Sequence, residues 1–294
     1  MGMNKLPLET RVRILNLLVE GSSMRSITRV CDVSINTVTK LLVEAGQAAE
    51  AFHDRTVVNV KSERVQCDEI WSFCYAKDRT APKELKEAGL AGDVWTWTAL
   101  DSDSKLMLTW YAGGRDAGTG ATFMEDVKAR LANRVQLTTD GHRAYLEAVR
   151  KTFGEDVDYA QLVKKYGPAP DKGPQRRYSP AQCVGADRSP VTGNPDADHI
   201  STSHVERANL SMRMGMRRFT RLTNAFSKKI DNHLNALALY FFHYNFCRIH
   251  KSLRVSPAQQ AGITDELLSM ENLCAIMDAA NPAKKRGPYK KAAA

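Results

Sequence analysis

The sequence has no long apolar run, because no stretch approaches the roughly eighteen consecutive apolar residues of a membrane-spanning helix. The start of the chain also lacks the unbroken apolar core of a signal peptide, since Glu9, Arg11, Arg13 and Glu20 interrupt its leucines. No glycine-rich cofactor fingerprint is visible either. These absences argue against a membrane protein, a secreted protein and a cofactor-dependent metabolic enzyme. We expect a cytoplasmic protein.

The cysteines form no C-x-x-C pair, so neither a zinc ribbon nor a disulfide framework is indicated. We expect them to be reduced and buried. They are Cys31, Cys67, Cys74, Cys183, Cys247 and Cys274.

What the sequence does have is length and positive charge. Its 294 residues, 43% of them hydrophobic and 26% charged, suffice for a good-sized folded core and a small accessory domain. The formal net charge of +9 favours polyanionic partners, because Lys and Arg gain affinity from counterion release when they neutralise phosphates. Charge alone does not separate nucleic acid from an anionic membrane.

Residues 1–45 have the pattern of three helices in a helix-turn-helix domain. Apolar residues recur at helical spacing from Leu8 to Val19 and stop at Gly21, a residue that suits a helix end. Ser22 or Ser23 can cap a second helix that carries Met24, Ile27 and Val30 inward. After a tight turn at 31–33, Ser34 can cap a third helix, and its apolar stripe consists of Ile35, Val38, Leu41 and Leu42.

The third helix is placed as a recognition helix. Asn36, Thr37 and Lys40 lie on its outer face, where amide and hydroxyl groups can read base edges in the major groove. Arg25, Arg29 and Lys40 could hold phosphates and set the register. The alternative is a plain three-helix bundle with solvated charges.

The middle of the chain predicts an α/β sheet with helices on its faces. Residues 46–62 are read as a linker with some helix. Strands are expected at 65–75, 94–100, 106–111 and 135–139, with a hairpin turn at 101–103. Helices are expected at about 119–133 and 142–153.

Two carboxylates stand out in this sheet. Asp68 lies inside an apolar strand, where a charge is costly unless it is paired or holds a metal. Its neighbour Glu69 should point to the opposite face, so the two cannot easily serve one site. Asp140 ends the fourth strand, where α/β sheets commonly place ligands. Taken alone, Asp140 is better explained as the Asp of an Asp-Gly turn or as the cap of the following helix.

A third carboxylate, Glu206, is also open to two interpretations. Ser203 and Glu206 fit the S-x-x-E capping box, which would occupy the carboxylate at a helix start. Glu206, Asn209 and Arg213 fall on one helix face, so an acid for a metal and a cation for a phosphate would lie two turns apart.

Five segments, 67–73, 139–142, 201–210, 217–229 and 244–253, resemble the DDE transposases of bacterial insertion sequences, especially the insertion-sequence-one type. The similarity runs to about residue 263. The resemblance implies a ribonuclease-H-like catalytic domain at 63–263 whose acidic triad is Asp68, Asp140 and Glu206, with Arg213 at the basic position seven residues later. It also implies a nucleoid-associated enzyme that binds element ends and target DNA as a dimer or larger assembly.

The mechanism that we expect uses two Mg²⁺ ions, for which Mn²⁺ would substitute, because hard divalent cations favour carboxylate oxygens. Asp68 would bridge both ions, and Asp140 and Glu206 would hold one each. Water would free the 3′ end of the element, and that hydroxyl would attack target DNA. His204 is a possible contributor to proton transfer, although a histidine at a helix start is more often a surface or packing residue.

Further basic segments extend the expected DNA surface. Arg217 and Arg218 belong to a dense cationic run, although such runs are usually just solvated. Residues 164–198 are either a DNA-contacting insertion or a flexible loop, and 264–294 are a helix followed by a basic tail. Two alternatives remain open: a catalytically silent regulator descended from a transposase, and a nuclease of the same fold.

Overall fold

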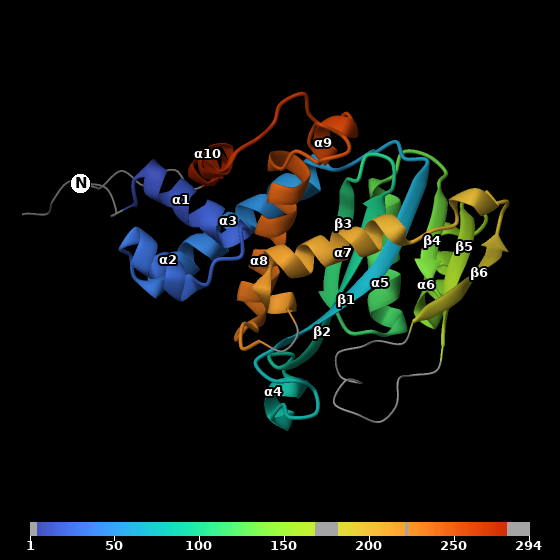
Figure 1. Ribbon diagram of the computed structural model, residues 1–294, viewed down its shortest axis with the longest axis horizontal. Coiled ribbons are helices and arrows are strands. Elements are labelled where there is room, and N and C mark those ends of the chain that lie inside the picture. The colour runs from blue at the N-terminus through green and yellow to red at the C-terminus, as the bar shows by residue number, and fades with distance from the viewer. Residues whose placement is uncertain (1–4, 168–181, 221–222, 281–294) are drawn as a thin grey trace, which may run out of the picture.

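The computed structural model describes residues 5–167, 182–220 and 223–280, whose strands form a six-stranded mixed sheet in the order β3-β2-β1-β4-β5-β6 (Figure 1). β1 runs antiparallel to β2 and parallel to β4; β2–β3 and β5–β6 are antiparallel, and β4–β5 is parallel. The strands are β1 Arg64–Cys74, β2 Gly92–Asp101, β3 Met107–Gly113, β4 Gln136–Asp140, β5 Asp158–Tyr166 and β6 Cys183–Thr192.

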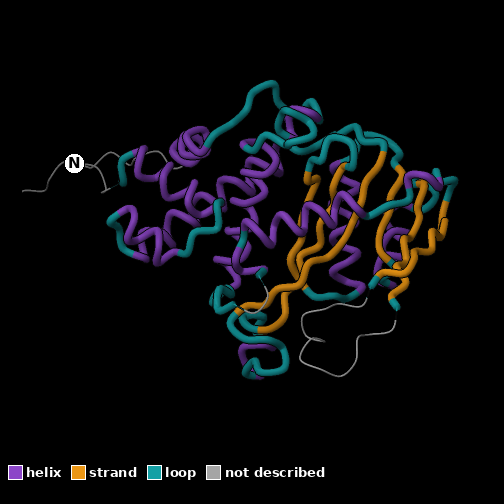
Figure 2. The backbone as a smooth tube through the Cα atoms, in the orientation of Figure 1, coloured by secondary structure: helices purple, strands orange, loops and turns teal. Residues whose placement is uncertain are grey.

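Helices surround this sheet and form a separate all-helical end, as Figure 2 shows. No helix among the described residues is long and apolar enough to cross a lipid bilayer. The α-helices are α1 Leu8–Val19, α2 Met24–Cys31, α3 Ile35–Thr56, α4 Lys83–Glu87, α5 Ala117–Arg130, α6 Arg143–Phe153, α7 Ser203–Gly215, α8 Ile230–Phe242, α9 Pro257–Gln260 and α10 Met270–Ala280. Short helical turns are η2 Ala197–His199, η3 Arg217–Phe219 and η4 His243–Cys247.

The two faces of the sheet carry different helices, which confirms the expected α/β arrangement. Even-numbered side chains of β1 face α7, since Asp68 contacts Asn209 of that helix. On the odd-numbered face, Glu69 pairs in register with Trp97 of β2, and the Trp97 ring packs on Phe123 of α5 and Tyr145 of α6. β1 therefore lies between two helical layers. In Figure 1, α7 belongs to one layer and runs across the strands.

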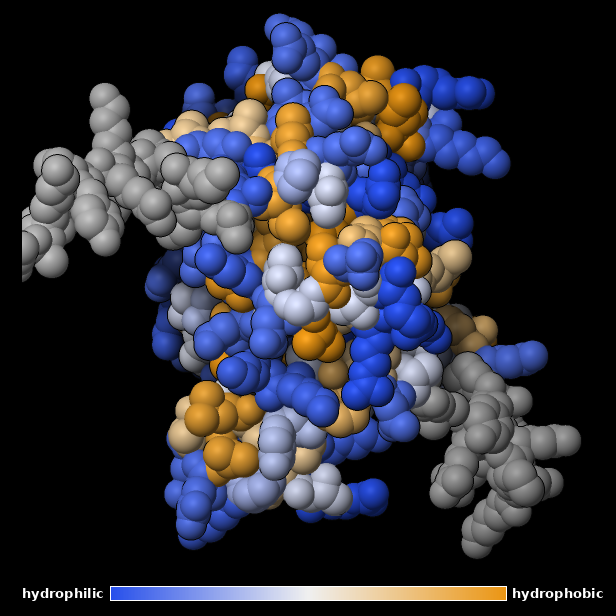
Figure 3. Space-filling model, turned by 90° about the vertical axis from the view of Figure 1, so that its left-hand side faces the viewer, coloured by the Kyte–Doolittle hydropathy of each residue, from blue (hydrophilic) through white to orange (hydrophobic). Residues whose placement is uncertain are grey.

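The first three helices form where the capping residues predict them. Ser23 Oγ accepts a hydrogen bond from the Ser26 amide, and Ser34 Oγ accepts one from the Thr37 amide, each at 3.1 Å. Gly21 has a φ of +76°, in the left-handed region that favours glycine. Figure 3 views this helical end of the molecule, where hydrophilic residues cover much of the surface around an apolar band.

Some inward assignments in these helices were wrong. Ile27, Val38, Leu41 and Leu42 are buried as expected, but Val30 is 58% and Ile35 44% exposed. Both lie beside the turn between α2 and α3, where the helices diverge. The expectation that the cysteines are buried holds for three of them and fails for Cys183, which is exposed; all six are free thiols.

α3 is much longer than the sequence suggested, because it continues through most of the expected linker to Thr56. Its second half packs along α8, where Phe52 makes edge contacts with Phe242 and Phe246 at 5.5 and 5.1 Å between ring centroids. A Cβ at Gly46 would lie 2.6 Å from the Asn235 Cα, so the glycine permits a close helix crossing. The all-helical end is thereby fixed to the sheet-bearing part.

Two further contacts tie the parts of the molecule together. Asn245 is fully buried, and its amide both donates to the Met107 carbonyl and accepts from the Met107 amide, each at 2.9 Å. In the all-helical end, Asp278 of α10 accepts two hydrogen bonds from Arg11 of α1, at 2.7 and 2.9 Å. The C-terminal helix of the described chain therefore packs on the N-terminal helices.

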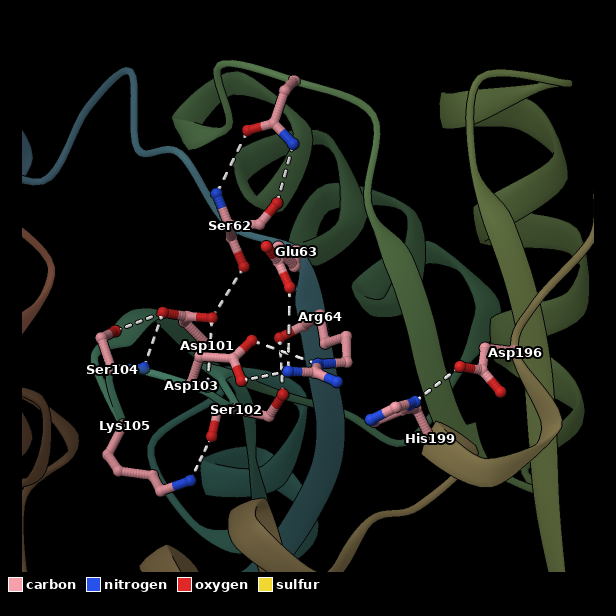
Figure 4. A network of polar contacts seen from close by, with 11 residues as sticks. Ser62, Glu63, Arg64, Asp101, Ser102, Asp103, Ser104, Lys105, Asp196 and His199 are labelled. Carbon is pink, nitrogen blue, oxygen red and sulfur yellow. Dashed lines mark hydrogen bonds and ion pairs between the residues drawn. The ribbon is translucent and has the colours of Figure 1, made fainter. Parts of the chain in front are cut away.

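The beginning of β1 is held by a polar network drawn in Figure 4. Arg64 pairs with Asp103 of the β2–β3 turn, and Ser62 Oγ donates to Asp101 Oδ1 at 2.8 Å. Asp101 also accepts from the Ser104 amide at 3.1 Å, which closes the turn. This network fixes the hairpin predicted at 101–103 against β1.

The segment 164–198 contains a strand that the sequence did not reveal. β6 pairs antiparallel with β5 from Tyr159↔Thr192 to Tyr166↔Cys183. Its residues are exposed apart from Thr192, which is half-buried, so β6 lacks the apolar alternation that marks a strand with one buried face. Residues 168–181 lie outside the described part of the chain, as does the basic tail after 280.

Replacing Gly46 by Ala tests the α3–α8 crossing. The added methyl group would overlap the Asn235 backbone, and overpacking of this kind costs about 1–3 kcal/mol. We expect urea denaturation to show a loss of unfolding free energy in that range. Gly185→Ala is the matched control, because a Cβ there meets nothing within 4 Å. Equal stability of the two variants would contradict the close crossing.

Candidate active site

The position of Asp68 is set by how α7 is attached to β1. Gln66 Oε1 accepts hydrogen bonds from the first amides of α7, those of His204 at 2.9 Å and Val205 at 3.2 Å. Two residues further along β1, Asp68 Oδ2 accepts from Asn209 Nδ2 at 2.8 Å. Thr98 Oγ1 donates to the Oδ1 atom of Asn209 at 3.3 Å. The helix is therefore aligned with the strand, and the Asp68 carboxylate is oriented by it.

Asp140 lies beside Asp68 because β4 ends there. β4 runs parallel to β1 with Cys67 opposite Thr139, so the next residue of each strand is an aspartate. Asp140 Oδ1 accepts from the His142 amide at 2.9 Å, which shows that the expected turn role is real. Its Oδ2 lies 3.9 Å from Arg115 NH2 and is not engaged by the turn. The turn and a functional role are compatible in this residue.

Glu206 is not part of a capping box. The cap of α7 is Thr202 rather than Ser203, and the Thr202 side chain makes no cap hydrogen bond to the helix. The Glu206 carboxylate instead accepts a hydrogen bond from Thr202 Oγ1 through Oε1 and pairs with Lys164 of β5 through Oε2. The competing structural explanation from sequence is therefore wrong, although the carboxylate does have protein partners.

Glu69 is the main departure from the sequence prediction. Its side chain leaves β1 on the face opposite to Asp68, as strand alternation requires, and is only 1% exposed. Even so, one carboxylate oxygen from each of Asp68, Glu69 and Asp140 lies within 4.8 Å of the other two. The longer glutamate side chain reaches the strand edge where Asp140 lies. Adjacent residues on β1 thus contribute to one acidic group, contrary to the expectation.

Burial and mutual repulsion make this group hard to ionise. Burial raises the pKa of Asp68 to about 6, and the charges of Asp140 and Glu206 add to the effect while the Asn209 hydrogen bond opposes it. Burial also raises the pKa of Glu69 to about 8, again with a contribution from Asp140, whereas Arg115 opposes the shift. Asp140 and Glu206 both contribute to the raised pKa of Asp68.

The arrangement could hold a metal ion. Carboxylate oxygens are the ligands that hard divalent cations prefer, and a cation would relieve the repulsion that raises these pKa values. Glu206 does not belong to the group within 4.8 Å, since its oxygens contact Thr202 and Lys164. The donors therefore suit Mg²⁺ or Mn²⁺ in kind, with Asp68 between Glu206 on one side and Glu69 on the other.

Two cations at the site were not anticipated from sequence. Arg115, from the loop between β3 and α5, lies 4.5 Å above the Trp95 ring and 3.3 Å from Glu69 Oε1 through its Nε. Lys164, on β5, pairs with Glu206; burial lowers the pKa of Lys164, but the Glu206 interaction outweighs it and the pKa is raised. Neither residue belongs to a motif that the sequence singled out, so only the sheet topology reveals them.

The structure changes the roles expected of several neighbours. Asn209 is buried and both ends of its amide are bonded within the protein, which differs from the DNA contact expected of it. Arg218 is likewise turned inward, donating to Ser227 Oγ at 2.8 Å and the Asn232 carbonyl at 3.2 Å. Arg213 is half-buried in α7, two turns after Glu206, and Arg217 is exposed in η3.

His204 lies at the start of α7, where it is exposed. Partial burial lowers its pKa, and the positive charge of Lys105 in the β2–β3 turn adds to the effect. Figure 4 shows that turn, which lies beside the start of β1. The role of His204 in proton transfer stays a prediction.

The residues expected to read DNA are accessible in the helical end. Arg25, Arg29, Asn36 and Lys40 are exposed, and Thr37 is half-buried with its hydroxyl 2.9 Å from Ser34 Oγ. Lys40 lies 3.8 Å from Glu44, a loose contact between exposed side chains. The outer face of α3 is thus available for a partner.

An open cavity of about 880 Å³ begins one strand away from the acidic group. It is lined by β5, β6 and the segment leading into α7, including Leu162, Arg188 and Ser201. Leu162 is the register partner of Asp140, so the cavity adjoins the end of β4. A ligand larger than an ion could extend into it from the acidic residues.

Comparison with protein-family models and with curated proteins found no match to this chain. What the site does is therefore inferred from its geometry and chemistry.

The raised pKa values predict how stability depends on pH in the metal-free protein. The folded state keeps protons on Asp68 and Glu69 up to about pH 6 and 8, whereas the unfolded chain releases them near pH 4. The unfolding free energy should therefore fall as pH rises from about 4 to 8, by up to about 1.4 kcal/mol per pH unit for each proton. Urea denaturation in EDTA at several pH values measures this. Glu69→Gln should remove much of the slope above pH 6; an unchanged slope would exclude Glu69 as its source.

Proposed function

We propose that this protein is a DNA transposase of the DDE type, which cleaves the ends of a mobile element and joins them to target DNA. The observation that carries the proposal is the convergence of Asp68 inside β1 with Asp140 at the end of the parallel strand β4. Glu206 lies on α7, the helix that Gln66 and Asn209 hold against β1. Phosphoryl transfer depends on positioned acidic groups that hold divalent cations next to a phosphodiester.

The fold is compatible with this proposal. Three antiparallel strands are followed by β4 and β5 parallel to β1, with helices on both faces, which suits a ribonuclease-H-like catalytic domain. The three helices before it supply exposed Asn36 and Lys40 on α3, which suits a helix-turn-helix reader of the element ends. The net charge of +9 favours a polyanionic substrate.

Each residue of the site has a distinct task in this proposal. Bound Mg²⁺ ions would activate water or a 3′-hydroxyl and neutralise developing charge. Asp68 and Asp140 would hold the cations on the strand side, and Glu206 would do so from α7. Asn209 orients Asp68 through its 2.8 Å hydrogen bond and so acts as a positioning residue. Lys164 and Arg213 would place positive charge near the phosphates.

Joining two element ends to one target requires two copies of the catalytic site, so a dimer or larger assembly on DNA belongs to the proposal. A nuclease of the same fold would use the same carboxylates without joining, and the reaction products separate the two activities. A catalytically silent DNA-binding regulator is disfavoured, because all three carboxylates are present in the sequence.

Amide substitutions of the three carboxylates test the catalytic assignment. Removing one electrostatic group that stabilises a phosphoryl-transfer transition state should cost about a hundredfold or more in rate. Asp68→Asn, Asp140→Asn and Glu206→Gln should each lose cleavage and strand transfer of labelled element ends with Mg²⁺. Glu147→Gln, an exposed carboxylate on α6, is the matched control. Full activity in any one of the three variants would remove that residue from the mechanism, and cleavage without joined products would favour the nuclease.

Two substitutions on α3 test the DNA-reading assignment. Asn36→Ala should cost about 1–3 kcal/mol of binding to the element end and relax base preference, because an amide reads a base edge. Lys40→Ala should weaken binding to all sequences and lower the salt slope by about 1. Lys83→Ala, an exposed lysine on α4, is the control. Fluorescence anisotropy over a salt series measures both effects; identical behaviour of Lys40→Ala and Lys83→Ala would contradict the assignment.

A further inference from the structure

One carboxylate oxygen of Glu69 is buried without a hydrogen-bond partner among the described residues. Its side chain is 1% exposed, and within the described part of the chain Oε2 is buried without a hydrogen bond. Leaving a buried acceptor unsatisfied costs about 1–3 kcal/mol, and more when the group is charged. A buried carboxyl in this state indicates a partner that the protein itself does not provide.

The neighbours of Oε1 do not supply that partner. Arg115 Nε lies 3.3 Å away, longer than the 2.7–2.9 Å that is typical of a charge-assisted bond, and its guanidinium is stacked on Trp95. His142 Nδ1 lies 3.7 Å away but accepts a hydrogen bond from the Ala144 amide, so this nitrogen carries no proton to donate. Glu69 therefore has one long contact for two oxygens.

The direction of the side chain completes the case. Glu69 lies beside the rings of the α5–α6 face, since its Oε1 is 3.7 Å from His142, whose ring packs on Trp97 and Tyr145. From there it also reaches Asp68 and Asp140. Three ionised carboxylates within 4.8 Å repel one another, and Arg115, 3.3 Å from Glu69 and 3.9 Å from Asp140, faces only two of them. The orphaned oxygen and the convergence are separate observations, and both point to a cation.

We propose that Glu69 is a ligand of a divalent cation that it holds together with Asp68 and Asp140. This deepens the proposed function, on which its catalytic meaning rests: Glu69 completes the cation site on the α5–α6 side of Asp68, and Glu206 serves the α7 side. The site takes a hard cation of the Mg²⁺ or Mn²⁺ class, because its donors are carboxylate oxygens. Arg115 is the resident positive charge that the cation displaces from Glu69.

The test measures Mn²⁺ binding to the full, metal-free chain by electron paramagnetic resonance of the free ion. Glu69→Gln should weaken Mn²⁺ binding about tenfold or more, the size of effect that altered metal sites commonly show. Glu69→Asp keeps the negative charge but shortens the side chain by one methylene group, so it should weaken binding to a similar extent. Glu147→Gln should bind as the unaltered protein does.

Each outcome decides the matter. Weaker Mn²⁺ binding in both Glu69→Gln and Glu69→Asp supports the proposal. Unchanged Mn²⁺ binding in Glu69→Gln overturns it. Loss in Glu69→Gln with full binding in Glu69→Asp also overturns it, because Glu69 would then act by charge alone. Circular dichroism and urea denaturation establish that both variants fold. Absence of Mn²⁺ binding in the unaltered protein would remove the cation site altogether, whereas binding without DNA cleavage would defeat the transposase proposal and leave the Glu69 assignment intact.

Discussion

The hold of α7 on β1 is the constraint on which the site depends. Gln66 fixes the first turn of the helix and Asn209 fixes its middle, so the strand and the helix share one alignment. Without it, Glu206 would have no defined relation to Asp68, because the two residues are far apart in sequence and belong to different layers. Two neutral amide side chains therefore determine where the charged groups lie.

Around this alignment the protein balances charge that it cannot neutralise completely. Arg115 and Lys164 each approach one side of the acidic residues, at Glu69 and at Glu206. Neither cation is deeply buried, since their side chains are 39% and 32% exposed, so each can move toward solvent or a phosphate. The raised pKa values of Asp68 and Glu69 show that this compensation is partial. The repulsion left over favours binding of further positive charge.

Much of the fold could be predicted from sequence because its signals are local. Runs rich in β-branched and aromatic residues marked β1 to β4, and serine caps marked α2 and α3. β6 was missed because its residues are mostly exposed and give no periodic signal. The length of α3 was missed because the residues after Gly46 are mostly polar and small, and Gly46 itself admits α8. Among site residues, strand alternation placed Asp68 correctly and misled for Glu69, since it describes where a side chain starts and not how far it reaches.

The continuous helix α3 has a consequence for how distance is measured along a partner molecule. Its 22 residues span on the order of 33 Å in one rigid rod, with exposed polar residues at one end and packing against α8 along the other. Such a rod acts as a fixed ruler between the exposed polar residues at its start and the strands that carry the carboxylates. A segment recognised at its tip and a bond placed at Asp68 would be separated by a constant spacing, set by helix geometry and not by the sequence between them.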